Sequence, residues 1–535
     1  MWQLSASQMR NAILVLLAAI AAFSTGCFEK PRPATLSTPL LRSHFIGMTQ
    51  LIQSSNAPKV REVWALPASA DLRRKALDKI AKTPFQLAQK VLPAGAVDQP
   101  TLIRPLLDDL LASESYIELK SPEAGSDSVI AVQLDEQRAR VWDTNLWQLV
   151  AAWKLNKPQP LSGGISGWES RGAGITFQFQ RRGKWVLAGW SLGKLAGLNS
   201  LASAFGKSDR PVPPAKSIIE LQADLPALGR WSPILAKYKL APVDLTITPR
   251  GEYIRTEAQL SLSEPLTWKF EPWRIPTNII SDPLTSFSVA QRVDPLLKAL
   301  PGFDELGLKH PPSQACAWGQ KQTFNSFWTF PMENASNVLP RIAAKAPAFV
   351  KSYLEQPVGT MTYITNRSEM VWTGLPLAVP VLRSVTSGSQ DYLLLGLLPP
   401  SNRIFPPPPE LFSQIGNRSN LMYYDWEITQ FRLEQARQLY QVIDMAHLRL
   451  LGSTNDPSFK WVDQTAALLG NTITEISMTS PKQLQFVRKS HIGFTGFELA
   501  TMLRWIDSPA FPLGYEPPAS PRRKPAPTPS QPKSK

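Results

Sequence analysis

The chain has 535 residues, 43% of them hydrophobic and 19% charged, so it is too long for one small domain and too apolar to be disordered throughout. Its 50 prolines exclude long uninterrupted helices and coiled coils. Lysine and arginine (57) outnumber aspartate and glutamate (42), which gives a formal net charge of +15. This balance favours anionic partners such as lipid headgroups, envelope polymers or nucleic acid, or simply keeps a soluble protein away from its isoelectric point.

The N-terminal residues have the pattern of an export signal. A short polar segment with one charge, Arg10, precedes the unbroken apolar run from Ala12 to Phe23, and small residues follow. This run is too short to span a bilayer, which needs about 20 apolar residues. Residues 1–26 are therefore predicted to be a secretory signal peptide.

The end of this signal, Ser24-Thr25-Gly26-Cys27, resembles a bacterial lipobox. In that family the cysteine is diacylated and becomes the mature N-terminus, although leucine is usual at the position of Ser24. The resemblance implies a lipid anchor at Cys27 that holds the protein on a membrane surface without a spanning segment. Phe28 stands where inner-membrane lipoproteins of enteric bacteria carry aspartate, which favours the outer membrane. The alternative is ordinary cleavage near the same point.

After a short tether over residues 27–39, residues 40–113 show apolar positions at helical spacing with proline breaks, which predicts a small helical region. From residue 114 onwards, segments that alternate apolar and polar residues predict strands. Turn signals such as Arg182-Gly183 and Pro249-Arg250-Gly251 separate paired strands.

The order of these segments predicts an α+β fold made of repeated β-α-β-β units. The expected sheets are mainly antiparallel with helices on one face, and the small helical region precedes them. The four expected units cover residues 114–210, 211–310, 311–402 and 403–515.

Residues 516–535 are predicted to be a disordered tail, because residues 517–535 combine many prolines with basic residues and have no acid. Arg522, Arg523 and Lys524 make this tail the expected contact with an anionic envelope polymer. No nucleic-acid partner is expected.

One catalytic motif is present. Gly189-Trp190-Ser191-Leu192-Gly193 matches G-x-S-x-G between an expected strand and an expected helix, the context of a nucleophile elbow. Ser191 would then be the nucleophile of a hydrolase, with His447 or His491 as its base. The alternative is a strand-to-helix turn in which Ser191 caps the helix.

Other sites are not indicated. The two cysteines, Cys27 and Cys316, make no disulfide framework or zinc site, and the four histidines are scattered singly. No metal or cofactor is therefore expected. Cys316, close to Trp318, is predicted to be a small buried apolar residue.

The mature chain resembles uncharacterised exported bacterial proteins built from helix-on-sheet units. The likeness rests on the order of elements and on segments such as SNLMYYDWEIT and QLQFVRKSHIGFTGFEL, and it implies no activity. The expected function is a non-enzymatic binding or structural role in an exported, lipid-anchored protein. This protein would lie on the periplasmic face of a bacterial membrane or on the cell surface. The alternative is a periplasmic serine hydrolase that uses Ser191.

Overall fold

A computed structural model of the protein describes most of the chain between residues 40 and 515. The described ranges are 40–120, 127–162, 165–192, 195, 198, 201–203, 205, 217–228, 241–299, 303–306, 308, 310–322, 324–353, 359–375, 378–400, 406–407, 409–446 and 456–515. Cys27 and the predicted tail, including Arg522, Arg523 and Lys524, lie outside the described residues.

The first half of the described chain contains ten strands. Its elements are β1 (Leu41–Phe45), α2 (Met48–Gln53), α3 (Pro58–Ala65), α4 (Pro67–Ile80), α5 (Thr83–Ala88), α6 (Pro100–Ala112), β2 (Ser115–Leu119), β3 (Asp127–Gln133), α7 (Glu136–Ala152), β4 (Gln159–Pro160), β5 (Gly167–Gly172), β6 (Ile175–Arg182), β7 (Trp185–Leu192), β8 (Ile219–Ala223), α9 (Leu225–Leu228), β9 (Val243–Arg250) and β10 (Tyr253–Ser261).

The second half contains ten further strands. Its elements are β11 (Leu284–Gln291), α11 (Asp294–Lys298), η2 (Phe303–Leu306), β12 (Gln314–Gln320), β13 (Ser326–Pro331), α12 (Ala335–Tyr353), β14 (Thr360–Ile364), η3 (Thr365–Arg367), β15 (Glu369–Thr373), β16 (Val381–Ser387), β17 (Gln390–Gly396), α13 (Pro409–Gly416), β18 (Leu421–Ile428), α14 (Thr429–Ala446), α15 (Pro457–Thr465), η4 (Ala466–Leu468), β19 (Asn471–Ser480), β20 (Gln483–Ser490) and α16 (Gly496–Asp507).

All twenty described strands pair antiparallel in one continuous sheet. From one edge to the other the order is β4-β5-β6-β7-β3-β2-β1-β8-β9-β10-β20-β19-β18-β11-β12-β13-β17-β16-β15-β14. Only β4 and β14 are edge strands among the described strands. Each of the others has a neighbour on both sides, so its backbone donors and acceptors are used within the sheet.

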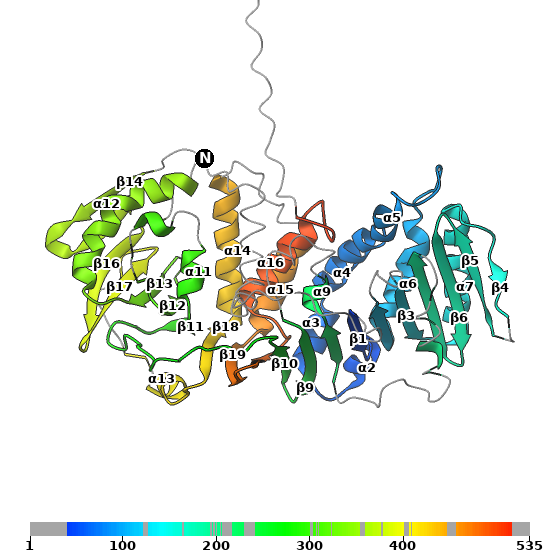
Figure 1. Ribbon diagram of the computed structural model, residues 1–535, viewed down its shortest axis with the longest axis horizontal. Coiled ribbons are helices and arrows are strands. Elements are labelled where there is room, and N and C mark those ends of the chain that lie inside the picture. The colour runs from blue at the N-terminus through cyan, green and yellow to red at the C-terminus, as the bar shows by residue number, and fades with distance from the viewer. Residues whose placement is uncertain are drawn as a thin grey trace, which may run out of the picture.

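This order contains an internal duplication. Each strand of the first half corresponds to one strand of the second half, β1 to β11, β2 to β12 and so on to β10 and β20. The two sets of ten strands follow the same spatial order from their edge to the middle of the sheet. The equivalent strands β10 and β20 meet antiparallel, with Ile254 opposite Ser490 and Ser261 opposite Gln483. The two halves are therefore related in the way that the subunits of a two-fold dimer are. Figure 1 shows β4, β5 and β6 at one end, β14, β16 and β17 at the other, and β10 and β19 in the middle.

The predicted fold of four β-α-β-β units with helices on one face is wrong. The repeat is a ten-stranded half that occurs twice, and its strands join one sheet instead of separate ones. The prediction failed because alternation within a strand indicates which residues share a face but not which distant strand will pair with it. Strands β1 and β11, for example, pair with β8 and β18 respectively.

Helices lie on both faces of the sheet, as β18 demonstrates. The Tyr424 hydroxyl donates to Gln414 Oε1 of α13 at 3.3 Å. The next residue, Asp425, lies 3.7 Å from an Arg432 nitrogen of α14. Because successive strand residues point to opposite faces, α13 and α14 cover opposite sides of the sheet.

The predicted helical region over residues 40–113 contains the five helices α2–α6, but it begins with a strand of the sheet. Leu41–Phe45 forms β1, an interior strand of the sheet that pairs with both β2 and β8. Helices α2–α6 follow it in the chain. Helix α4 packs against the second half, where Ala68 and Leu72 share a core cluster with Trp461, Leu499 and other residues of α14–α16. The inserted helices thus lie over the sheet of their own half and also contact the other half (Figure 1).

The two halves differ in how one face of the sheet is covered. In the first half the β1–β2 connection spans residues 46–114, and Met48, Leu51 and Leu111 of its helices pack over the sheet. The equivalent β11–β12 connection spans only residues 292–313. The connection that covers the sheet in the first half is thus much shorter in the second half, where its described part holds only α11 and η2.

Candidate functional site

Ser191 lies inside a strand. It is fully buried in β7, opposite Asp127 of β3 and Thr176 of β6. A Cβ at Gly189 would come within 3.0 Å of the Leu195 and Leu198 side chains, which shows how closely this strand is covered. A nucleophile elbow instead holds its serine on an exposed turn after the strand. The structure therefore does not give Ser191 that geometry.

Six strands of the sheet separate β7, which contains Ser191, from β20, which precedes His491, one of the two histidines proposed as its base. His491 follows β20, accepts a hydrogen bond at Nδ1 from the Gly470 N–H at 2.8 Å, and stacks on Tyr253. His447 and Gly193 lie outside the described residues. The prediction for Cys316 is confirmed, since this thiol is buried in a core cluster and burial raises its pKa.

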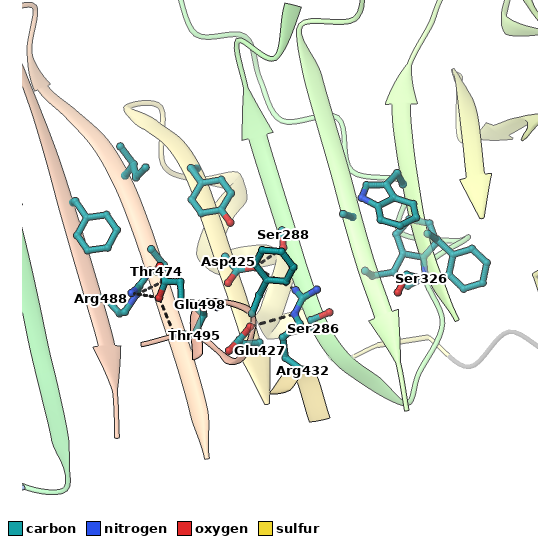
Figure 2. A pocket seen from close by; sticks show the side chains of 18 residues that line it. Ser286, Ser288, Ser326, Asp425, Glu427, Arg432, Thr474, Arg488, Thr495 and Glu498 are labelled. Atoms are coloured by element: carbon teal, nitrogen blue, oxygen red, sulfur yellow. Dashed lines mark hydrogen bonds and ion pairs between the residues drawn. The ribbon is translucent and has the colours of Figure 1, made fainter. Parts of the chain in front are cut away.

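A cavity of about 330 Å³ lies in the second half, between the sheet and helices α14 and α16. Figure 2 shows Ser288, Asp425, Thr474 and Arg488 on neighbouring strands of the sheet. The strands that supply its walls are β11, β12, β13, β18, β19 and β20. Its size lies at the lower end of the range for pockets that take small organic ligands.

Two acidic side chains of β18 face this cavity. Because they are two residues apart in a strand, Asp425 and Glu427 point to the same face. Arg432 lies near the start of α14. Its Nε is 3.2 Å from Glu427, and one of its terminal nitrogens is 3.7 Å from Asp425. The Ser288 hydroxyl of β11 donates to Asp425.

Glu427 is nearly completely buried, and its position ties α16 to the sheet. It accepts a hydrogen bond from the Gly496 N–H at the start of α16 at 2.7 Å. Burial raises the pKa of Glu427 to about 7, against the opposing effect of the Arg432 guanidinium and with a further contribution from Asp425. This carboxyl group is therefore partly protonated near neutral pH.

A second ion pair closes another side of the cavity. Arg488 of β20 binds Glu498 of α16 through two hydrogen bonds of 2.7 and 2.9 Å, and its Nε donates to the Thr474 hydroxyl. Glu498 also belongs to the capping box of α16, since it accepts from the Thr495 N–H. The same carboxylate thus begins the helix and neutralises the arginine.

Aromatic side chains form much of the remaining wall. Trp328 of β13, Tyr423 of β18, Phe486 of β20 and Phe497 of α16 line the cavity. Burial raises the pKa of Tyr423 well above its ordinary value, so its hydroxyl stays protonated. The aromatic walls and the charged groups together are typical of a site that binds an organic molecule by contact and orients it by a few polar groups.

The polar part of the cavity lining consists of carboxylates, guanidinium groups and hydroxyl groups. Among its described lining residues there is no histidine or cysteine. Groups of three or more metal-ligating side chains are also absent from the described ranges. The carboxylates and guanidinium groups that are present already hold one another in place.

This site was not among those predicted from the sequence. The alternation of Tyr423, Asp425 and Glu427 along one strand was a usable signal, since acids on the inward side of a strand require a partner. The structure also contains an unpredicted buried pair: His44 Nε2 lies 3.0 Å from Glu114 Oε1, and the His44 ring stacks on Tyr116. No local pattern indicates that pair, because the two residues belong to different ends of an inserted segment.

None of the described helices combines the length and apolar character that crossing a bilayer requires. Comparison with known proteins gives no match to any protein family and no match among curated proteins. A crystal structure of TP0453 (crystal form I) resembles part of the chain at 9% identity, with a TM-score of 0.24, and covers 44% of this chain and 78% of TP0453. A likeness at that score carries no argument about fold or function.

Proposed function

We propose that this protein is an exported, lipid-anchored envelope protein whose body binds a small organic ligand. The observation that carries the binding role is the cavity of about 330 Å³ beside Asp425, Glu427 and Arg432. It lies where the duplicated fold is covered by inserted helices in one half and has only a short connection in the other. Charged and aromatic side chains line this space.

The envelope location is supported by the N-terminal sequence. The apolar run from Ala12 to Phe23 followed by Ser24-Thr25-Gly26-Cys27 has the order of a lipoprotein signal. Lipid on Cys27 would keep the body at a membrane surface, and the basic residues Arg522, Arg523 and Lys524 would add attraction to anionic polymer nearby.

The anchor is tested by fractionating cells that express the full chain. We expect wild type in the membrane fraction and in the detergent phase, and Cys27→Ala in neither. Cys316→Ala is the matched control, because it removes the other cysteine from a buried position and should partition as wild type does. A wild-type protein that remains in the soluble fraction after export would contradict the anchor.

The binding role is tested with the neutral fluorescent dye N-phenyl-1-naphthylamine. Ala317 lies on β12 in the cavity wall, so Ala317→Phe should fill the space and weaken dye binding by about tenfold or more. Thr386→Phe, on the exposed end of β16, is the control with the same added side chain. Equal dye affinity in all three proteins, each with an unchanged melting temperature, would show that the cavity is not the binding site.

A further inference from the structure

We propose that the cavity selects an organic cation, an ammonium group attached to an apolar or aromatic body. This inference rests on the binding role proposed above and specifies the chemical class of its ligand. Three observations lead to it: the balance of charge in the cavity, the incomplete pairing of Asp425, and the aromatic walls.

The described cavity residues include one more acid than base. Three carboxylates, Asp425, Glu427 and Glu498, face two guanidinium groups, Arg432 and Arg488. Arg488 is committed to Glu498 by its two hydrogen bonds. Arg432 alone therefore serves both acids of β18, so one negative charge is left without a counter-charge when Glu427 is ionised, which it is above a pH of about 7.

Asp425 is the acid with the weaker pairing. Arg432 lies within hydrogen-bond distance of Glu427 at 3.2 Å, but it stays 3.7 Å from Asp425. The hydrogen bond from Ser288 fixes the direction of the Asp425 carboxylate without neutralising it. Asp425 is only 5% exposed, and a buried carboxylate costs free energy that a bound cation would offset.

The walls around this carboxylate suit a cation with an apolar body. Trp328, Tyr423 and Phe497 are partly exposed and line the same space. The face of an aromatic ring attracts an ammonium group within about 6 Å, and the attraction is stronger where water is excluded. An anion would instead meet two carboxylates beside a single arginine that is already bound.

Binding of a cation should also depend on pH. Glu427 gains charge as the pH rises through about 7, which makes the cavity more negative. The titratable and charged groups that line the cavity with it are Tyr423 and Asp425 on β18, Arg432 on α14, Arg488 on β20 and Glu498 on α16. An amine that stays protonated should therefore bind about threefold or more tightly at pH 8 than at pH 6.

The test is calorimetric titration of the full chain with three probes of similar shape: phenethylamine, 2-phenylethanol and phenylacetate. We expect phenethylamine to bind about tenfold or more tightly than either of the others. Asp425→Asn should remove most of this preference without weakening 2-phenylethanol. Glu475→Gln is the control, since Glu475 lies on the same sheet but bonds Arg418 on the opposite face.

The outcomes separate this inference from the proposed function. Equal affinity for amine and alcohol, or a preference for phenylacetate, would overturn the cation while leaving a binding site in place. The cation proposal would also be overturned if none of the three probes bound, although the dye bound to wild type and Ala317→Phe blocked dye binding. Failure of the dye test itself would remove the proposed function. If Asp425→Asn does not fold, a flat pH profile for phenethylamine binding to wild type would count against the inference.

Discussion

Glu427 shows how one buried side chain joins the sheet, a helix and the candidate site. It accepts from the Gly496 N–H, contacts Arg432 and is 1% exposed. Its ordinary pKa of 4.5 is raised to about 7 by burial, so the folded chain holds a proton there that the unfolded chain releases between those pH values. By linkage, this group stabilises the fold relatively more below pH 4.5, and that contribution is lost as the pH rises through 7.

We therefore expect Glu427→Gln to gain stability relative to wild type as the pH rises from 5 to 8. Glutamine keeps an acceptor for Gly496 but cannot ionise, so the difference in the free energy of unfolding should change by on the order of 2 kcal/mol over this interval. Urea denaturation at both pH values measures it. Glu475→Gln serves as the control, and an equal change in that variant would contradict the assignment to Glu427.

At the scale of elements, helix α4 connects the two halves through a shared ionic cluster. Lys75 lies 2.9 Å from Asp456, which caps α15, and 2.7 Å from Asp507 at the end of α16. Burial lowers the pKa of Lys75, but hydrogen bonds from the ammonium group to the two carboxylates outweigh that effect and the net change is upwards. Lys79 adds hydrogen bonds to the carbonyl groups of residues 506–508. This cluster fixes the inserted helices against α15 and α16.

Lys75→Met should lower the free energy of unfolding by about 1–2 kcal/mol, because it leaves two neighbouring carboxylates without their shared cation. Arg74→Met on the same helix is the matched control. Its ion pair with Asp71 is largely exposed and should contribute less than about 0.5 kcal/mol. Thermal and urea unfolding of the two variants provide the comparison, and equal losses would show that the cluster does not hold the helices together.

The whole molecule depends on the junction where β10 and β20 pair. Ala258 and Leu260 of β10 share a core cluster with Leu484 and Phe486 of β20, so the apolar contacts cross from one half to the other. The sheet hydrogen bonds cross at the same place, over eight residue pairs. We infer that this junction couples the strands on either side of it, so that β9 and β10 of one half should open together with β19 and β20 of the other.

Leu484→Ala, at a site 1% exposed, should cost about 3 kcal/mol and should reduce amide protection in β9 and β10 as well as in β19. Leu339→Ala is a matched control: Leu339 is fully buried, but in the α12 cluster far along the sheet. Hydrogen exchange should show that this control loosens β16 and β17 and spares β9. Protection lost equally in both variants would contradict a local junction.

Local features of the fold, the hairpin turns and the burial of one cysteine, could be predicted from the amino-acid sequence alone. The hairpins β6–β7 and β9–β10 form as predicted around Gly183 and Gly251, whose positive φ angles of 57° and 61° suit glycine. Burial of Cys316 was likewise readable from its apolar neighbours. These features follow from alternation and turn chemistry, which act over a few residues.

The sheet order, the duplication and the candidate site could not be predicted from the sequence and are seen only in the folded chain. Ser191 fits a catalytic motif by its neighbours in sequence, yet it is enclosed within a strand by the pairing of β7 with β3 and β6. Asp425 and Glu427 could be predicted to share a face, but Arg488 and Glu498 join them through β18–β20 pairing and the packing of α16. Strand pairing and helix packing depend on contacts between residues far apart in the chain, and no local pattern specifies which partners will meet.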